Sequence, residues 1–536
     1  MSDAVLDDFT KEANCMVLIR CFTALSLMMC LLACASSTQA TAADKPNVVI
    51  IYADDIGYGD IGAYGGEIPT PNIDAMSKGG LKFTNGYCPS ATCTPSRFAM
   101  LTGQYAFRQK GTGIARGDAA MIIKPGTTTL ASIMKDAGYK TAVVGKWHLG
   151  LGAGGKKLDW NKPIKPTPND IGFDYSYIMA ATGDRVPCVY IKNREVVNLD
   201  PNDPIKVSYG KNANFPGELD GKKDRDKLIM DWSHGHNNAV INGIGRIGYM
   251  TGGKAALWND IDMADDFTEE AVAFIERSKD EPFFLFFALH DNHVPRVPHP
   301  RFVGKSGQGP RGDAVVQFDW CVGEIKKTLD KLGLSENTLI IVSSDNGPVL
   351  DDGYKDQANE LLGTHKPGGP LRAGKYSMFE GGTRVPFITY WPGTIKPGTS
   401  EALMTQVDFP ATFAAMTGQA LSDTATPDSY NTLDALLGKT DEGRAYIVQH
   451  ANGVALRMGD WKYMPDADGG WQGRGKKGTR DKLGPWGWYT TPQGGALFNL
   501  SNDPGETKNV SGQHPEVMKQ MREKLKSILD AERTRP

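Results

Sequence analysis

Short apolar runs alternate with amphipathic segments along most of this chain. Asn47–Tyr52 is apolar throughout after its first residue, which is typical of a strand buried on both faces of a parallel sheet. Three similar runs follow, at Thr141–Val144, Phe283–Leu289 and Thr338–Ser343. Apolar residues at helical spacing predict helices at Thr127–Ala137, Asp265–Arg277 and Asp313–Leu332. This alternation predicts an α/β fold, with a large, mostly parallel sheet flanked by helices.

From Leu433 the pattern changes to short strands. We expect them at Ala445–His450, Gly453–Met458, Trp461–Tyr463 and Ala496–Leu500. A closing helix is predicted at Pro515–Ala531, with proline in its first turn. The sequence therefore predicts a large domain at 43–432 and a smaller C-terminal α+β subdomain with an antiparallel sheet at 433–536.

Two long polar stretches interrupt the large domain. Gly150–Asp170 and Pro187–Asn259 are rich in Gly, Pro, Asn and Asp. Because connections in compact domains are usually short, stretches of this length favour functional insertions over a site.

The first 42 residues read as a leader. Arg20 precedes an apolar run from Cys21 to Ala35, and small residues follow up to Ala42, as in a secretory signal peptide that starts at Met16. We therefore expect an exported protein, periplasmic or secreted, with no transmembrane span once the leader is removed. Leu31-Leu32-Ala33-Cys34 resembles a lipobox, which leaves a lipid anchor on Cys34 as an alternative.

Composition narrows the classes of partner. The 536 residues carry 59 Lys and Arg against 62 Asp and Glu, a formal charge of −3, which argues against recognition of nucleic acid or a membrane surface by bulk charge. An anionic ligand must then be held by a local cluster of cations. Four of the eight cysteines lie beyond the leader, at Cys88, Cys93, Cys188 and Cys321, too few for a disulfide scaffold and without the spacing of a zinc site.

Three predicted strands end in polar residues. Asp54 and Asp55 follow the first strand, Asp345 and Asn346 follow Thr338–Ser343, and Lys146 and His148 follow Thr141–Val144. Ligands bind at the carboxyl ends of parallel strands, so these side chains are expected to converge. The carboxylates and the amide are hard oxygen donors that suit Ca²⁺ or Mg²⁺ better than zinc. Taken alone, either acidic pair also fits an ordinary turn.

One further segment points to a family. Cys93-Thr94-Pro95-Ser96-Arg97, followed by Leu101-Thr102-Gly103, resembles the signature of type I, formylglycine-dependent sulfatases of the alkaline phosphatase superfamily. Other blocks are similar to the family's and stand in its order: Gly145–Gly150, His293-Val294-Pro295, Ser344–Gly347, Gly374–Pro386 and Leu497–Thr507. The resemblance spans roughly residues 45–510. Gln104 departs from it, since the family often has arginine there.

The resemblance implies a mechanism. Cys93 would be oxidised to Cα-formylglycine (3-oxoalanine) by a formylglycine-generating enzyme. One hydroxyl of the hydrated aldehyde, held on a single Ca²⁺, would attack the sulfur of a sulfate ester, and the other would then expel sulfate. The implied metal ligands are Asp54, Asp55, Cys93, Asp345 and Asn346. The implied catalytic residues are Cys93, Arg97 beside the diol, Lys146 and Lys375 on the sulfate oxygens, His148 as base, and His293 on the sulfate or the leaving alcohol.

The substrate is less legible. We predict that the protein hydrolyses O-sulfate esters of carbohydrates. The segment around His290–Arg296 has a weaker resemblance to exo-sulfatases of galactose-type sugars, which implies an exo-acting enzyme on such sugars. Sugar hydroxyls favour charged and bidentate partners, which makes these residues candidates for sugar binding: His290, Asp184, Arg185, Arg296 and His365. Two alternatives are a phosphatase or phosphonate monoester hydrolase of the same superfamily, and a non-catalytic protein that binds sulfated glycans.

Overall fold

The computed structural model describes residues 45–155, 157–211, 213–451, 453–465 and 495–536. The predicted leader and Cys34 lie outside these residues. Residues 46–536 group as one compact unit, and the subdomain boundary at residue 433 stays a prediction. Within the described residues, no helix has the length and apolar character needed to cross a membrane.

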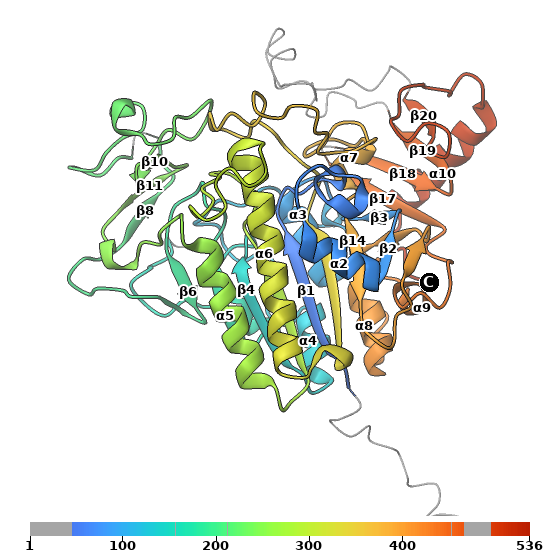
Figure 1. Ribbon diagram of the computed structural model, residues 1–536, viewed down its shortest axis with the longest axis horizontal. Helices are drawn as coiled ribbons and strands as arrows, with labels where there is room; N and C mark the ends of the chain where they lie inside the picture. Colours follow the sequence, from blue (N-terminus) through green and yellow to red (C-terminus); the bar gives the residue numbers. More distant parts are fainter. Residues whose placement is uncertain (1–44, 156, 212, 452, 466–494) are drawn as a thin grey trace, which may run out of the picture. The chain divides into compact units, whose positions relative to one another are not determined.

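A ten-stranded sheet forms the centre of the molecule (Figure 1). Its strand order is β15 (Gly398–Ser400), β2 (Leu81–Phe83), β14 (Phe387–Tyr390), β13 (Thr338–Ser344), β1 (Asn47–Ala53), β12 (Phe283–Ala288), β4 (Lys140–Lys146), β5 (Tyr175–Met179), β6 (Tyr190–Lys192) and β7 (Glu195–Val196). The strands from β13 to β5 pair in parallel, whereas β14 and β6 pair antiparallel to their neighbours. The predicted mostly parallel sheet is therefore confirmed.

Helices cover both faces of this sheet. On one face α2 (Pro71–Gly79) and α5 (Met263–Ser278) both contact α6 (Gly309–Lys331). The other group contains α3 (Cys93–Thr102), α4 (Leu130–Asp136) and α8 (Phe409–Thr417), which contact one another. Two short helices also form, α7 (Glu380–Thr383) and α9 (Leu433–Leu436). The predicted strands and helices all form, with ends shifted by a few residues.

The core explains why the apolar runs become central strands. Ile50 of β1 pairs with Phe286 of β12 and Ile341 of β13, and all three are essentially unexposed. Burying a side chain of this size contributes about 1.5–3 kcal/mol relative to leaving it in water. A strand with such residues on both faces is stable only between two other strands and two helical layers.

The stretch Pro187–Asn259 is more structured than a loop-like insertion. Its first part forms β6 and β7, which extend the large sheet, because Tyr190 and Ile191 are apolar enough to be buried there. Beyond them lie two strand pairs, β8 (Lys206–Ser208) with β11 (Tyr249–Thr251) and β9 (Val240–Ile241) with β10 (Ile244–Gly245). A further pair elsewhere joins β3 (Gly86–Tyr87) to β16 (Met404–Thr405).

The C-terminal part forms the expected antiparallel sheet. Its order is β17 (Tyr446–His450), β18 (Val454–Met458), β19 (Trp461–Met464) and β20 (Ala496–Asn499), and α10 (Pro515–Asp530) packs on it. Met521 and Leu525 of α10 share an apolar cluster with Ala99 of α3. The amide of Ala91 also donates to the carbonyl of His450, at 2.7 Å. This sheet therefore supports the segment that leads into Cys93.

His450 makes the stability of this region sensitive to acid. Burial lowers the pKa of its imidazole from the usual 6.5 to about 4, so the unfolded chain binds a proton in a range where the folded chain does not. The contribution of His450 to stability is complete above pH about 6.5 and is lost as the pH falls toward about 4. We expect His450→Gln to flatten the pH dependence of Tm in that window, measured by thermal unfolding at closely spaced pH values. An unchanged slope would contradict this role.

Candidate active site

The polar residues at the strand ends converge, as predicted. Ala53 of β1 pairs with Ser344 of β13, so Asp54 and Asp345 leave the sheet side by side. Lys146 is the last residue of β4, which lies one strand further along the same edge, beyond β12. These three side chains, with Asp55 and Asn346, are fully buried at the carboxyl edge of the sheet.

Three cations surround the three carboxylates. Lys146 forms an ion pair with Asp54, Arg97 Nε lies 2.8 Å from Asp345 Oδ2, and Lys375 Nζ lies 2.9 Å from Asp55. Burial, reinforced by Asp345, raises the pKa of the Asp54 carboxyl well above its usual value, and burial likewise raises the pKa of Asp55. The cluster is therefore arranged to gain from an additional positive charge.

The donor atoms left without partners indicate where such a charge would bind. Asp54 Oδ1 and Asn346 Oδ1 are buried without a hydrogen-bond partner, while the Asn346 amide donates to Asp55 Oδ1 at 2.7 Å. Ligand atoms of Asp54, Cys93 and Asp345 all lie within 4.8 Å of one another. Orphaned buried oxygens are costly unless something satisfies them. These buried groups could hold a metal ion, and their oxygens fit a hard divalent cation.

Cys93 begins α3 inside this cluster, with 2% of its surface exposed. Burial raises the pKa of its thiol, although Lys146 and Lys375 oppose that shift. A neutral thiol between two carboxylates is a weak nucleophile.

Two histidines direct a lone pair toward the cluster. Nε2 of His148 donates to the carbonyl of Ala115 at 2.9 Å, and its Nδ1 has no partner. Nδ1 of His293 donates to the carbonyl of Val294 at 2.8 Å, and its Nε2 lies 3.9 Å from Asp55 Oδ2. Burial lowers the pKa of both imidazoles well below 6.5, helped by the neighbouring lysines. In the neutral form of each ring, these contacts leave Nδ1 of His148 and Nε2 of His293 as the acceptor nitrogens.

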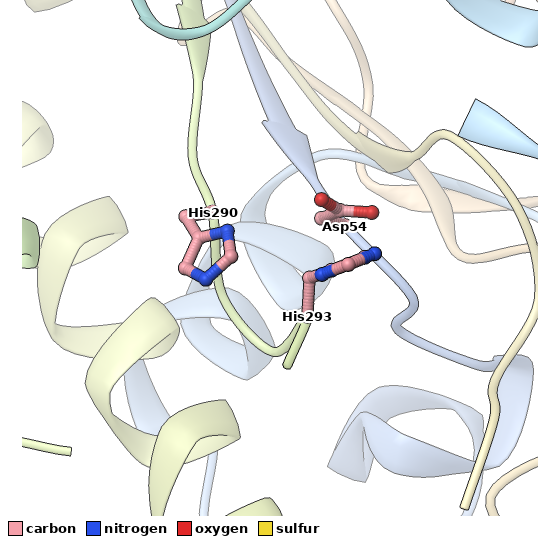
Figure 2. Close-up of side chains that lie close together, drawn as sticks. All are labelled: Asp54, His290 and His293. Carbon is pink, nitrogen blue, oxygen red and sulfur yellow. The ribbon is translucent and has the colours of Figure 1, made fainter. Parts of the chain in front are cut away.

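His290 stands beside His293, on the same turn after β12 (Figure 2). The two ring centroids are 5.5 Å apart, and ligand atoms of both rings lie within 4.8 Å of one from Asp54. Neither nitrogen of His290 has a hydrogen-bond partner, and burial, with Lys146, lowers its pKa to about 3. An unpartnered, buried imidazole next to the cluster is available to a ligand.

A second group adjoins these histidines. Arg185 Nη1 lies 2.8 Å from Asp184 Oδ1, and His236 Nε2 lies 2.8 Å from Asp184 Oδ2. Burial opposes ionisation of Asp184, but Arg185 and His236 still hold the pKa of its carboxyl well below the usual range. A Cβ on Gly183 would come within 2.7 Å of His290 Nε2, so this segment packs directly against His290. Sequence reasoning missed His236, which lies in a polar insertion without a motif.

Two of the predicted sugar-binding residues do not join the cluster. Arg296 is buried and donates to Asp356 at 2.7 Å and to the carbonyls of Asn292, Val349 and Leu350. His365 is buried against Asp60, at 2.8 Å. The three guanidinium nitrogens of Arg296 and Nε2 of His365 therefore bond to groups within the protein, as buried polar groups must.

Asp352 is a residue of the site that the sequence did not reveal. Its carboxylate lies 2.8 Å from Lys375 Nζ and accepts from the hydroxyl of Tyr376 at 3.0 Å. It therefore orients Lys375 toward Asp55. The only signal in the sequence was its place in the polar run Asp351-Asp352-Gly353, six residues after Asp345.

Comparisons with known proteins agree with this geometry. The family model described as Sulfatase matches residues 46–419. The chain is 50% identical to N-acetylgalactosamine-6-O-sulfatase of Bacteroides thetaiotaomicron, with 90% of this chain and 93% of that protein covered. It is 32% identical to human arylsulfatase A, over 91% of this chain and 89% of that one. A solved structure from work on glycosaminoglycan metabolism by Bacteroides thetaiotaomicron superposes with a TM-score of 0.86 at 49% identity, covering 90% of this chain and 99% of that chain.

Proposed function

The chain belongs to the sulfatase family, and we propose that this sulfuric ester hydrolase removes the 6-O-sulfate of N-acetylgalactosamine or a similar galactose-type sugar, acting on the sugar at the end of a chain. The observation that carries the proposal is Cys93, set in Cys-Thr-Pro-Ser-Arg, with its side chain within 4.8 Å of Asp54 and Asp345. The 50% identity to an N-acetylgalactosamine-6-O-sulfatase supports the sugar and the position. The deep burial of the site residues supports action on a terminal sugar.

The proposed chemistry needs two groups beyond the unmodified chain. Asp54, Asp55, Asp345, Asn346 and residue 93 would hold Ca²⁺, which would neutralise negative charge. Cys93 converted to Cα-formylglycine would supply a hydroxyl nucleophile once water has added to its aldehyde. The orphaned oxygens of Asp54 and Asn346 support the calcium. The motif Cys93-Thr94-Pro95-Ser96-Arg97, placed beside Asp54 and Asp345, supports the modification.

The protein's own side chains orient residue 93, bind the sulfate and transfer protons. Arg97, held by Asp345, orients residue 93, and Lys146 and Lys375 bind the sulfate oxygens as negative charge develops on them. His148 takes a proton from residue 93 on its free Nδ1, because its Nε2 is committed to Ala115. His293 is an acceptor at Nε2 in its neutral form, so it must first gain a proton to act as an acid toward the leaving oxygen. The negative charge of a bound sulfate favours that proton.

We place the sugar against Asp184, Arg185 and His290, with His236 added to this set. His236 holds Asp184 in position at 2.8 Å, and carboxylate and guanidinium groups give directional hydrogen bonds to hydroxyls. Arg296 and His365 take no part, since their polar atoms bond within the protein.

His236→Ala is expected to lower kcat/KM for the sulfated sugar about thirtyfold, because Asp184 loses a charge-assisted partner and no longer points its carboxylate at the sugar. Steady-state kinetics on N-acetylgalactosamine 6-sulfate measure this. His234→Ala is the matched control, since His234 is more than half exposed and alanine keeps the carbonyl that accepts from His236 Nδ1. Equal effects of the two variants would contradict the assignment.

Maturation and location belong to the same proposal. The leader-like residues 1–42 support export to the periplasm or beyond, with a lipid anchor on Cys34 as the alternative. Formation of formylglycine requires a formylglycine-generating enzyme in the host.

The direct test measures sulfate release by the matured protein, in the presence of Ca²⁺, from N-acetylgalactosamine 6-sulfate, its 4-sulfate and galactose 6-sulfate. We expect preference for the 6-sulfates. Preference for the phosphate ester of the same sugar would instead favour the phosphatase alternative, and binding of the sulfated sugar without turnover by formylglycine-bearing protein would favour the non-catalytic one.

A further inference from the structure

An exposed arginine directly follows a buried residue that contacts the site, and it has no role in the proposed chemistry. Ala115 accepts from His148 Nε2 at 2.9 Å through its carbonyl, and its amide donates to the hydroxyl of Thr94 at 3.2 Å. Thr94 follows Cys93 directly, so both contacts tie residue 115 to the catalytic centre. The next residue, Arg116, leaves this buried segment with 62% of its side chain exposed.

Arg116 is held in place by an aromatic ring. Its guanidinium lies 5.2 Å from the centroid of the Tyr209 ring. Tyr209 is anchored in turn, since its hydroxyl donates to the carbonyl of Val186 at 2.5 Å and accepts from the amide of Gly117 at 3.0 Å. Val186 follows Arg185, a residue of the proposed sugar-binding group. Arg116 is thus linked to the catalytic centre through Ala115, and Tyr209 is linked to the sugar-binding group through Val186.

The guanidinium retains a free edge. Asp118 lies 3.0 Å from Arg116 Nε and 3.5 Å from Nη2, which leaves Nη1 turned away from that carboxylate. A guanidinium that lies over a ring and forms an ion pair along one edge is restricted before a ligand arrives, so it loses less freedom when it binds an anion. Arginine pairs with planar anions such as carboxylates more directionally than lysine does.

We propose that Arg116, stacked on Tyr209, is a binding site for an anionic group on the sugar next to the one that loses its sulfate. A uronic acid carboxylate is the class of group that fits the fork. This inference rests on the proposed function, because it assumes that a sulfated sugar occupies the group of Asp184 and Arg185. The proposal places the neighbouring sugar beside Arg116, which is exposed next to the residue that contacts His148.

The test compares two substrates in one enzyme. The probes are disaccharides in which N-acetylgalactosamine 6-sulfate is joined by the same linkage to glucuronic acid or to glucose. The matured wild-type enzyme is expected to favour the acidic disaccharide by about three- to tenfold in kcat/KM, the range of one partly exposed charged contact. Arg116→Ala should remove this preference, Arg116→Lys should keep part of it, and Arg116→Glu should reverse it.

The control and the contrary outcomes separate this inference from the proposed function. Lys124→Ala removes another exposed cation from the same connection and should leave the preference unchanged. If Arg116→Ala lowers kcat/KM equally for both disaccharides, or if the wild-type enzyme shows no preference, Arg116 does not read the neighbouring sugar. If the wild-type enzyme releases sulfate from neither disaccharide nor from the monosaccharide, the proposed function itself fails.

Discussion

Replacing Cys93 by alanine is expected to lower kcat for sulfate release by about four orders of magnitude or more, because the variant has no atom that can attack sulfur. The helix that begins at residue 93 should survive, since alanine favours helices and Cys93 is almost fully buried. Binding of the sulfated sugar should therefore persist while turnover is lost. The measurement is single-turnover sulfate release, together with sugar affinity by calorimetry.

Mass spectrometry adds a readout that does not depend on activity. Conversion of the Cys93 thiol to an aldehyde lowers the mass of its peptide by about 18 Da. Cys88→Ser is the matched control, because Cys88 is buried five residues earlier and bonds to the carbonyls of Ser90 and Thr383, which a hydroxyl can also do. Full activity with an unmodified Cys93, or in the alanine variant, would overturn the mechanism.

Removing Ca²⁺ is expected to lower kcat by about a hundredfold to a thousandfold, and added Ca²⁺ should restore it. Without the cation, burial raises the pKa of Asp54 and Asp55, which shows that their negative charges are costly in this site. The measurement is activity after dialysis against EGTA, with metal content from elemental analysis. Tm should also rise with added Ca²⁺, because an ion that binds only the folded state stabilises it.

The mutational counterpart is Asp345→Asn, which removes a proposed ligand and weakens the 2.8 Å contact with Arg97. We expect a loss of activity as large as that caused by chelation and not reversed by Ca²⁺. Asp313→Asn is the control, since Asp313 is equally buried but bonds to Gly304 and Ser306 away from the cluster. Undiminished activity of calcium-free enzyme would show that Lys146, Lys375 and Arg97 alone neutralise the sulfate.

The central strands, and the convergence of the proposed metal ligands with Cys93, were predictable from the sequence. Each rests on neighbours in the chain: the apolar run of β1 followed by Asp54 and Asp55, that of β13 followed by Asp345 and Asn346, and the compact pattern from Cys93 to Arg97. Strands buried on both faces must lie in the sheet, and the carboxyl ends of parallel strands share one edge. Local sequence therefore determined which residues converge there.

Tertiary structure decided the remaining contacts, because it joins residues that no spacing links. His236 reaches Asp184 across 52 residues, and Asp352 orients Lys375 across 23, both from polar loops without periodicity. Arg296 and His365 resembled sugar-binding residues by type, but the fold turned each inward to a carboxylate. The physical reason is that a charged side chain is suited to a ligand or to a buried partner alike, and only the surrounding packing determines which of them it meets.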